Sequence, residues 1–118
     1  MATRVLRTGE LRSGETRKFT LDCDGREIPG FVLNWQGELR AYVNRCRHVP
    51  MEMDWVENRF WSDDGRWILC ATHGALYEPE SGECVAGPPC GKSLVPLVLR
   101  VDGDDVWCEC PGPLPDDA

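Results

Sequence analysis

Two short stretches of the sequence each place a cysteine beside a histidine. The first is Cys46-Arg-His48 and the second is Cys70-Ala-Thr-His73, and the chain of 118 residues contains no other histidine. A lone cysteine or histidine is usually a core or hydrogen-bonded residue, but two thiolates and two imidazoles together form a complete ligand set. The two pairs therefore predict a metal site built from Cys46, His48, Cys70 and His73.

The spacing within the pairs distinguishes two kinds of metal site. Structural zinc sites usually take their ligands as Cys-x2–4-Cys and His-x3–5-His pairs. Here each pair mixes a cysteine with a histidine, so each loop can give one ligand to each of two irons, as in a Rieske-type [2Fe–2S] centre. A non-redox partner-binding module with a structural Cys2His2 zinc site remains the alternative.

Short apolar runs rich in β-branched and aromatic residues surround both pairs, and a glycine marks the turn between most of them. This pattern predicts an all-β fold made of antiparallel hairpins. Each cysteine–histidine pair directly follows a predicted strand, so the two ligand loops can meet at one end of a sheet. The expected strand pairs are 18–21 with 28–35, 28–35 with 38–45, 58–61 with 67–70, 75–77 with 83–85, and 95–101 with 105–110.

Charge and hydropathy exclude several classes of partner. The net charge of the chain is −7. Residues 1–18 carry five basic and two acidic groups, so residues 19–118 have a net charge of about −10. Phosphate backbones and anionic lipids need basic surfaces, so neither nucleic acid nor a membrane is expected as a partner. The sequence also has no apolar run near the roughly 20 residues of a membrane span and no signal-peptide pattern. We therefore expect a cytoplasmic protein.

These features resemble the Rieske iron–sulfur family over about residues 18 to 110. Cys46-Arg-His48 is similar to the first cluster loop of that family, and Cys70-Ala-Thr-His73-Gly74 is similar to the second. Tyr77-Glu-Pro-Glu-Ser-Gly82 resembles the strand and turn that follow, and Gly87-Pro88-Pro89 resembles the proline loop beside the cluster. The resemblance implies a Rieske-type antiparallel β-sandwich with a small cluster-binding subdomain and one [2Fe–2S] cluster per chain.

The resemblance also implies roles for individual residues. Cys46 and Cys70 would hold a buried iron, while His48 and His73 would hold an outer iron and leave their ring edges near solvent. Three further residues are expected to bind the cofactor: Tyr77, Gly87 and Pro88. The implied organisation is an N-terminal arm or first strand at 1–17, the Rieske domain at 18–110 and a flexible tail at 111–118.

The function implied is one-electron transfer by a soluble protein. Membrane-anchored Rieske proteins carry an extra cysteine in each cluster loop, whereas Met51 and Ala71 stand near those positions here. The chain thus resembles the ferredoxin component of an oxygenase, the small subunit of a reductase such as an assimilatory nitrite reductase, or an orphan Rieske protein. Its partners would be a reductase, an oxygenase or the large subunit of a nitrite reductase. No histidine remains for a mononuclear iron, so no catalytic residue is predicted and the chain alone should not be an oxygenase.

Five cysteines lie outside this ligand set. Without an export signal, cysteines are expected to remain thiols. A disulfide between Cys84 and Cys90, which bracket the proline loop, and a second metal pair at Cys108 and Cys110 are the less favoured alternatives. The remaining cysteine is Cys23.

Overall fold

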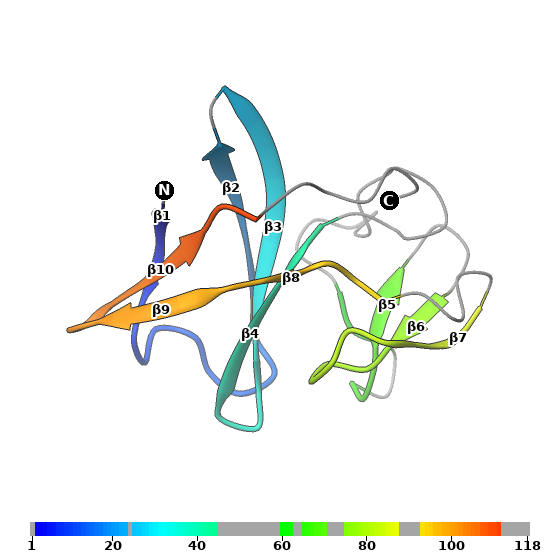
Figure 1. The fold of residues 1–118 in the computed structure, drawn as a ribbon. Helices are drawn as coiled ribbons and strands as arrows, with labels where there is room; N and C mark the ends of the chain where they lie inside the picture. Colours follow the sequence, from blue (N-terminus) through cyan, green and yellow to red (C-terminus); the bar gives the residue numbers. More distant parts are fainter. Residues whose placement is uncertain are drawn as a thin grey trace.

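The computed structural model describes residues 2–23, 25–44, 60–62, 65–70, 75–87 and 93–111. In these residues the regular secondary structure consists of strands, which confirms the predicted all-β fold (Figure 1). The described part contains no helix long and apolar enough to cross a membrane. The strands are β1 (Ala2–Arg7), β2 (Thr16–Cys23), β3 (Arg26–Trp35), β4 (Glu38–Val43), β5 (Ile68–Cys70), β6 (Ala75–Tyr77), β7 (Cys84–Ala86), β8 (Pro96–Leu97), β9 (Leu99–Asp102) and β10 (Asp105–Glu109).

The strands form three antiparallel sheets. The first has the order β1-β10-β9, the second β2-β3-β4-β8 and the third β5-β6-β7. In Figure 1 the small third sheet lies at the right of the molecule, and the two larger sheets lie at its centre and left. The large sheets thus form a base, and the third sheet forms a separate small subdomain.

Most of the predicted hairpins are present. β2 pairs with β3, β3 with β4, β6 with β7, and β9 with β10, each across a turn that contains a glycine. Residues 60–62 also pair with β5, because the Leu69 amide donates to the Phe60 carbonyl at 2.7 Å and the Ser62 amide donates to the Trp67 carbonyl at 2.9 Å. Residues 58, 59, 63 and 64 of this last hairpin lie outside the described residues.

The predicted single strand over 95–101 is wrong. It is divided into β8, which pairs with β4, and β9, which pairs with β10 in another sheet. Pro96 has no amide hydrogen and therefore limits the ladder with β4. Val98, 63% exposed, lies at the point where the chain passes from one sheet to the other. The pairing of β1 with β10 is likewise long-range, so the fold is not a simple meander.

Two apolar cores lie on opposite faces of the four-stranded sheet. Alternate residues of a strand point to opposite faces. Accordingly Phe31 of β3 packs in one core and Val32 in the other. The first core joins the base to the small sheet, and its fully buried aromatic rings include Phe31 and Phe60, stacked with centroids 4.1 Å apart. The second core joins the two large sheets.

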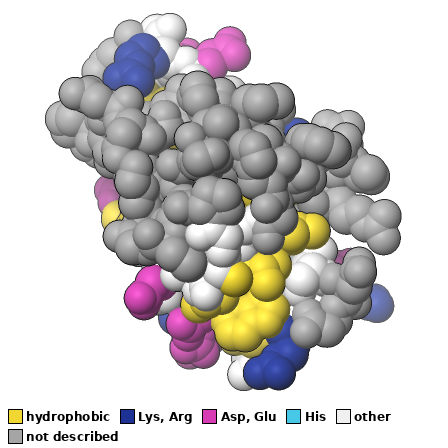
Figure 2. Space-filling model, turned by 90° about the vertical axis from the view of Figure 1, so that its right-hand side faces the viewer, with side chains coloured by type: hydrophobic (Ala, Val, Ile, Leu, Met, Phe, Trp, Pro, Cys, Tyr) yellow, Lys and Arg dark blue, Asp and Glu magenta, His cyan; other side chains and the backbone are white. Residues whose placement is uncertain are grey.

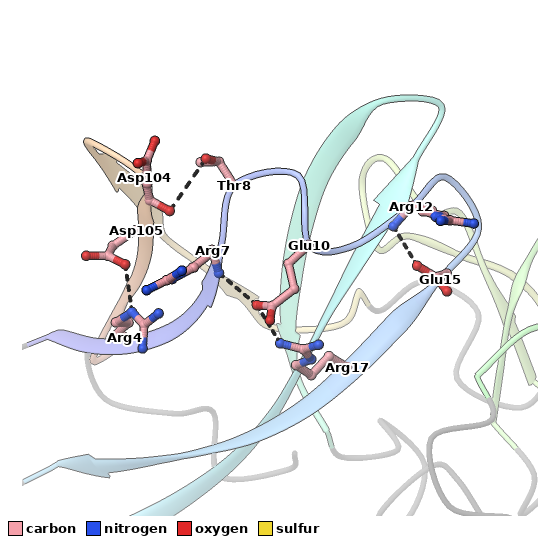
Figure 3. A network of polar contacts seen from close by, with 9 residues as sticks. All are labelled: Arg4, Arg7, Thr8, Glu10, Arg12, Glu15, Arg17, Asp104 and Asp105. Atoms are coloured by element: carbon pink, nitrogen blue, oxygen red, sulfur yellow. Dashed lines mark hydrogen bonds and ion pairs between the residues drawn. The ribbon is translucent and has the colours of Figure 1, made fainter.

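Exposed polar contacts hold the segment between β1 and β2 (Figure 3). The Glu10 carboxylate accepts hydrogen bonds from the Arg7 amide and the Arg17 guanidinium, both at 2.9 Å. These contacts lower the pKa of Glu10, with the Arg7 amide having the largest effect. Arg4 forms an ion pair with Asp105 at 2.7 Å. Because these groups are exposed, their contacts contribute little to the free energy of unfolding. Their main effect is to set the path of the chain between β1 and β2.

A disulfide joins Cys23 to Cys110, which corrects the expectation that both remain thiols. Cys23 ends β2 and Cys110 directly follows β10, so packing of the two large sheets brings them to a Cα–Cα distance of 5.9 Å. This distance lies within the range that a disulfide spans. The two residues are 87 positions apart, so no local pattern indicated their contact. Cys108, by contrast, is a buried thiol, and burial raises its pKa to about 11.

Tyr42 connects the base to the small sheet. Its hydroxyl donates to the Pro79 carbonyl at 2.8 Å, and its side chain is buried. A Cβ added at Gly82, in the turn between β6 and β7, would lie 2.7 Å from the Tyr42 ring. Burial raises the pKa of Tyr42 to about 12. The tyrosine on β4 thus holds the β6–β7 turn by a hydrogen bond and by direct packing.

Replacing Tyr42 by Phe tests this connection. At pH 8 the variant should be less stable by about 1 kcal/mol, because the Pro79 carbonyl loses its donor. In the wild type the neutral phenol stabilises the fold fully below pH 10, and this contribution is lost as pH rises toward 12. A shift of two pKa units corresponds to roughly 2.7 kcal/mol. Urea unfolding of both proteins between pH 8 and pH 11.5 should therefore show that the stability advantage of the wild type shrinks and then changes sign. The quantity compared is the free energy of unfolding. A difference independent of pH would contradict burial of the hydroxyl.

Candidate metal centre

The first hairpin of the small sheet is built around a predicted ligand. Cys70 is the last residue of β5 and pairs directly with Ala75, the first residue of β6. Both are fully buried on the face that packs against the base. Residues 71–74 connect the two strands, and they include the predicted ligand His73. The sequence thus folds so that a buried cysteine stands at the base of a four-residue connection that carries a histidine.

Part of the predicted site lies outside the described residues. These positions are Cys46, His48, His73 and Pro88. Asn44 follows β4 and is the last described residue before the first predicted ligand pair. It is buried, and its backbone amide donates to the Pro29 carbonyl at 2.8 Å. In the described part of the chain, no three or more histidine, cysteine or acidic side chains gather as a metal site. A complete ligand set would need residues outside the described part.

The three described site residues lie around Ala75. Cys70 is its partner across the β5–β6 ladder, and Tyr77 is two residues further along the same face of β6. Gly87 lies directly against it, because a Cβ added at Gly87 would be 2.8 Å from the Ala75 Cα. Gly87 also has a φ of +103°, a conformation that glycine adopts without strain. The start of the predicted proline loop is therefore pressed onto the start of β6.

Ala75 was not among the predicted site residues, although it is central to this packing. The sequence contains one signal of its role, namely the glycine at position 87, since glycine permits close approach of two backbones. What Gly87 approaches could not be read from the sequence. Tyr42 was missed for the same reason: its contact with Gly82 joins segments 40 residues apart.

Tyr77 is fully buried within the core that joins the small sheet to the base. It pairs with Ile68, and it shares with Cys70 and Ala75 the buried face of the sheet. Its ring is thus a packing element of the subdomain.

Cys84, the first residue of β7, is buried and keeps its thiol. The thiol donates a hydrogen bond to the Ala86 carbonyl at 3.2 Å. The disulfide with Cys90 considered as an alternative is therefore not formed. Cys90 itself lies outside the described residues.

The donor at Cys70 fits an iron–sulfur cluster. Its side chain lies among apolar groups, where an isolated thiolate would be costly to bury. Bound metal offsets that charge and deprotonates a coordinating thiol. The close packing of Gly87 on Ala75 would exclude water from this side. The described residues thus fit a [2Fe–2S] group.

The surface around the small sheet is partly apolar and partly acidic. Figure 2 looks onto this side of the molecule and shows exposed hydrophobic side chains next to acidic ones, below the residues drawn in grey. Trp35 and Trp61 are half-buried against the first core and stack with ring centroids 5.6 Å apart. Three carboxylates, Glu78, Glu80 and Glu83, occur within the segment from β6 to β7.

Solved structures share this fold. The chain matches the ferredoxin of carbazole 1,9a-dioxygenase from Nocardioides aromaticivorans IC177 with a TM-score of 0.67 and 20% identity, covering 91% of this chain and 95% of that one. It matches a complex of reduced oxygenase and oxidized ferredoxin in carbazole 1,9a-dioxygenase with a TM-score of 0.70 and 19% identity, covering 91% of each chain. It also matches the terminal oxygenase of carbazole 1,9a-dioxygenase from Novosphingobium sp. KA1, with a TM-score of 0.72 and 16% identity, covering 97% of this chain and 31% of that one.

The family is settled by sequence rather than by these structures. No curated protein matches the chain significantly. The model of the Rieske [2Fe-2S] domain, however, matches residues 2–106, which is most of the chain. The zinc-module alternative finds no support. The chain belongs to the Rieske [2Fe–2S] domain family, and it therefore carries a Rieske-type [2Fe–2S] cluster and transfers single electrons.

Proposed function

We propose that this protein is a cytoplasmic ferredoxin that delivers single electrons to an oxygenase, with Cys46, His48, Cys70 and His73 as the ligands of its cluster. The observation that carries the ligand assignment is the β5–β6 hairpin. A buried cysteine ends β5 opposite Ala75, and the four residues between them include His73. The cysteine and the histidine of this pair would thereby be supplied by one hairpin.

The burial of Cys70 suggests how the ligands are divided between the irons. Cys70 and, by analogy, Cys46 would hold the inner iron, because thiolates there lie against the core. His48 and His73 would hold the outer iron and leave their ring edges toward solvent. When bound, the cluster supplies a group that accepts and releases one electron. Tyr77, Gly87 and Pro88 would pack around it and exclude water.

One argument favours a carrier over an oxygenase. Both histidines of this chain would be used by the cluster, so none remains in it for the mononuclear iron of an oxygenase. The neighbouring complexes pair a ferredoxin with an oxygenase, which supports an oxygenase as acceptor. A reductase would be the electron donor, and residues 18–110 would form the electron-carrying domain between an N-terminal strand and a tail.

Purification and single-turnover kinetics test this function. The isolated protein should be brown-red and contain two irons and two acid-labile sulfides per chain. After chemical reduction, mixing with a Rieske-type oxygenase should reoxidise it in a stopped-flow experiment, with matching reduction of the oxygenase. A colourless protein that contains zinc would refute the cluster. A reduced cluster that no oxygenase reoxidises would refute the proposed acceptor alone.

Substitution of His73 tests the ligand set. His73→Ala should remove a ligand and abolish the Rieske paramagnetic signal. His73→Cys should move the site toward an all-thiolate cluster, whose potential lies near −400 mV rather than between about −150 and +300 mV. Cys108→Ala, which removes a sulfur from the interior of β10, should leave the spectrum unchanged. An unaltered spectrum in both His73 variants would show that His73 is not a ligand.

Tyr77→Phe tests whether the tyrosine hydroxyl donates to a cluster sulfur. Such a donor favours the reduced, more negative state, so its loss lowers the potential. Ala75 stands where high-potential members of the family are expected to carry a second hydroxyl, so we expect a potential in the lower half of the Rieske range. A net hydrogen bond of about 1 kcal/mol corresponds to roughly 40 mV for one electron. Protein-film voltammetry should show a fall of that order, and an unchanged potential would leave Tyr77 as a packing residue.

Gly87→Ala tests the packing of the proline loop on β6. The new methyl would lie 2.8 Å from the Ala75 Cα, in a φ region that disfavours side chains. We expect a loss of roughly 1–3 kcal/mol in stability and faster loss of iron to a chelator. Gly37→Ala is the matched control, because Gly37 has a φ of +92° but no atom within 4 Å of an added Cβ. Equal rates of iron loss in the two variants would contradict a specific role for Gly87.

A further inference from the structure

The disulfide between Cys23 and Cys110 lies apart from the predicted cluster ligands. Cys23 packs against the core between the two large sheets, whereas Cys70 belongs to the core beneath the small sheet. Both disulfide cysteines are half-buried rather than enclosed. Cys23 is the last residue of β2 and Cys110 directly follows β10, and local opening is least costly at such strand ends.

Apolar packing joins the two large sheets, and strand pairing holds β10, in addition to this disulfide. Leu6 of β1, Leu21 of β2 and Val106 of β10 are all buried in the core that joins the two large sheets. β1 also pairs with β10 from Ala2 to Arg7. Breaking the sulfur–sulfur bond would therefore release two strand ends and leave the sheets packed.

The neighbouring thiol does not compete with this pair. Cys108 lies two residues before Cys110, but it is in the interior of β10 and fully buried. Burial and, to a lesser extent, Glu109 raise the pKa of its thiol to about 11. At neutral pH only about one such thiol in ten thousand is a thiolate, which is the form that exchanges with disulfides. Cys108 therefore does not exchange readily with the disulfide between Cys23 and Cys110.

The charges around the two sulfurs differ. Arg26 is directly opposite Cys23 in the β2–β3 ladder, and side chains so paired have Cβ atoms about 4.5–5.5 Å apart. Acidic residues adjoin both sulfurs in the sequence, Asp22 before Cys23 and Glu109 before Cys110, and the Glu109 carboxylate pairs with Arg100 at 3.9 Å. The difference between the two sulfurs therefore rests on the cross-strand Arg26. A guanidinium at that position would stabilise a Cys23 thiolate and make Cys23 the leaving group.

We propose that Cys23 and Cys110 form a second redox site, a thiol–disulfide couple that a protein dithiol of the Cys-x-x-Cys class reduces while this protein remains folded. One thiolate of the dithiol attacks the Cys110 Sγ, the bond to Cys23 breaks, and the electron pair leaves on the Cys23 Sγ. The second thiolate of the dithiol then attacks its own partner sulfur and releases Cys110. Two electrons and two protons pass to Cys23 and Cys110, and the dithiol becomes a disulfide.

Thiol labelling of the holoprotein tests this site. The protein is incubated with a thioredoxin-type dithiol protein, alkylated without denaturant and mapped by peptide mass spectrometry. Before reduction neither cysteine should be labelled, and afterwards both should be. The visible spectrum of the reoxidised cluster should be retained. The melting temperature should fall by roughly 10 °C, and Cys110→Ser should show the lower value with or without dithiol.

Arg26→Gln tests the direction of attack. It should slow the reduction several-fold, whereas Arg7→Gln, at the far end of β1, should not. In the Cys23→Ser variant, Cys110 has lost its disulfide partner. A dithiol protein whose second cysteine is removed, and whose first cysteine carries an activating disulfide group, should form a stable mixed disulfide with Cys110. An Arg26→Gln variant reduced as fast as the wild type would overturn the assigned leaving group.

Two results would overturn the site as a whole. One is labelling of Cys23 and Cys110 in the untreated protein, which would mean that no disulfide forms. The other is reduction that occurs only above the unfolding temperature, which would make the bond a structural crosslink. Both readouts are independent of the oxygenase, so failure here and failure of the proposed electron acceptor are distinguishable.

Discussion

Alternate residues of β3 and β4 are buried on opposite faces of the four-stranded sheet. Phe31 and Tyr42 face the small subdomain, while Val32 and Ala41 face the first sheet. A shift of one residue in the β3–β4 register would exchange these two sets of side chains. Both the attachment of the small sheet and the closure of the base therefore depend on this one register. Figure 1 shows the result, with the four-stranded sheet between its two neighbours.

The small sheet has three-residue strands, too short to be stable alone. It is held by the β6–β7 turn. Tyr42 donates to the Pro79 carbonyl, and the Leu94 amide donates to the Gly82 carbonyl at 2.8 Å, so the turn is fixed from β4 and from the segment before β8. The same short strands fix the position of Cys70 and Gly87. A site on such a sheet is as well ordered as the turn that holds it, so Tyr42 would be among the determinants of the proposed metal centre.

The sequence predicted the local part of this structure and not the long-range part. Asp102-Gly103 indicated a turn between apolar runs, and the chain does reverse there, with Gly103 at a φ of +62°. Hairpins of this kind depend on a few adjacent residues. The pairings of β1 with β10 and of β4 with β8 depend on packing between distant segments, for which no local residue gives a signal. The cysteine and histidine types at 46–48 and 70–73 indicated the family, but the approach of Gly87 to Ala75 required the fold.

The positions of the cysteines within strands explain their different chemistry better than their sequence neighbours do. Cys108 lies inside β10 with a ladder on each side, so its side chain is enclosed and its thiol is held neutral. Cys23 and Cys70 are each the last residue of a strand, where the backbone leaves the ladder and the sulfur can meet a group from another segment. For Cys23 that group is Cys110, which follows the end of β10. For Cys70 it would be iron, reached by the connection that carries His73. One sheet protein can thus keep two kinds of sulfur chemistry apart by placing them at the ends of different sheets.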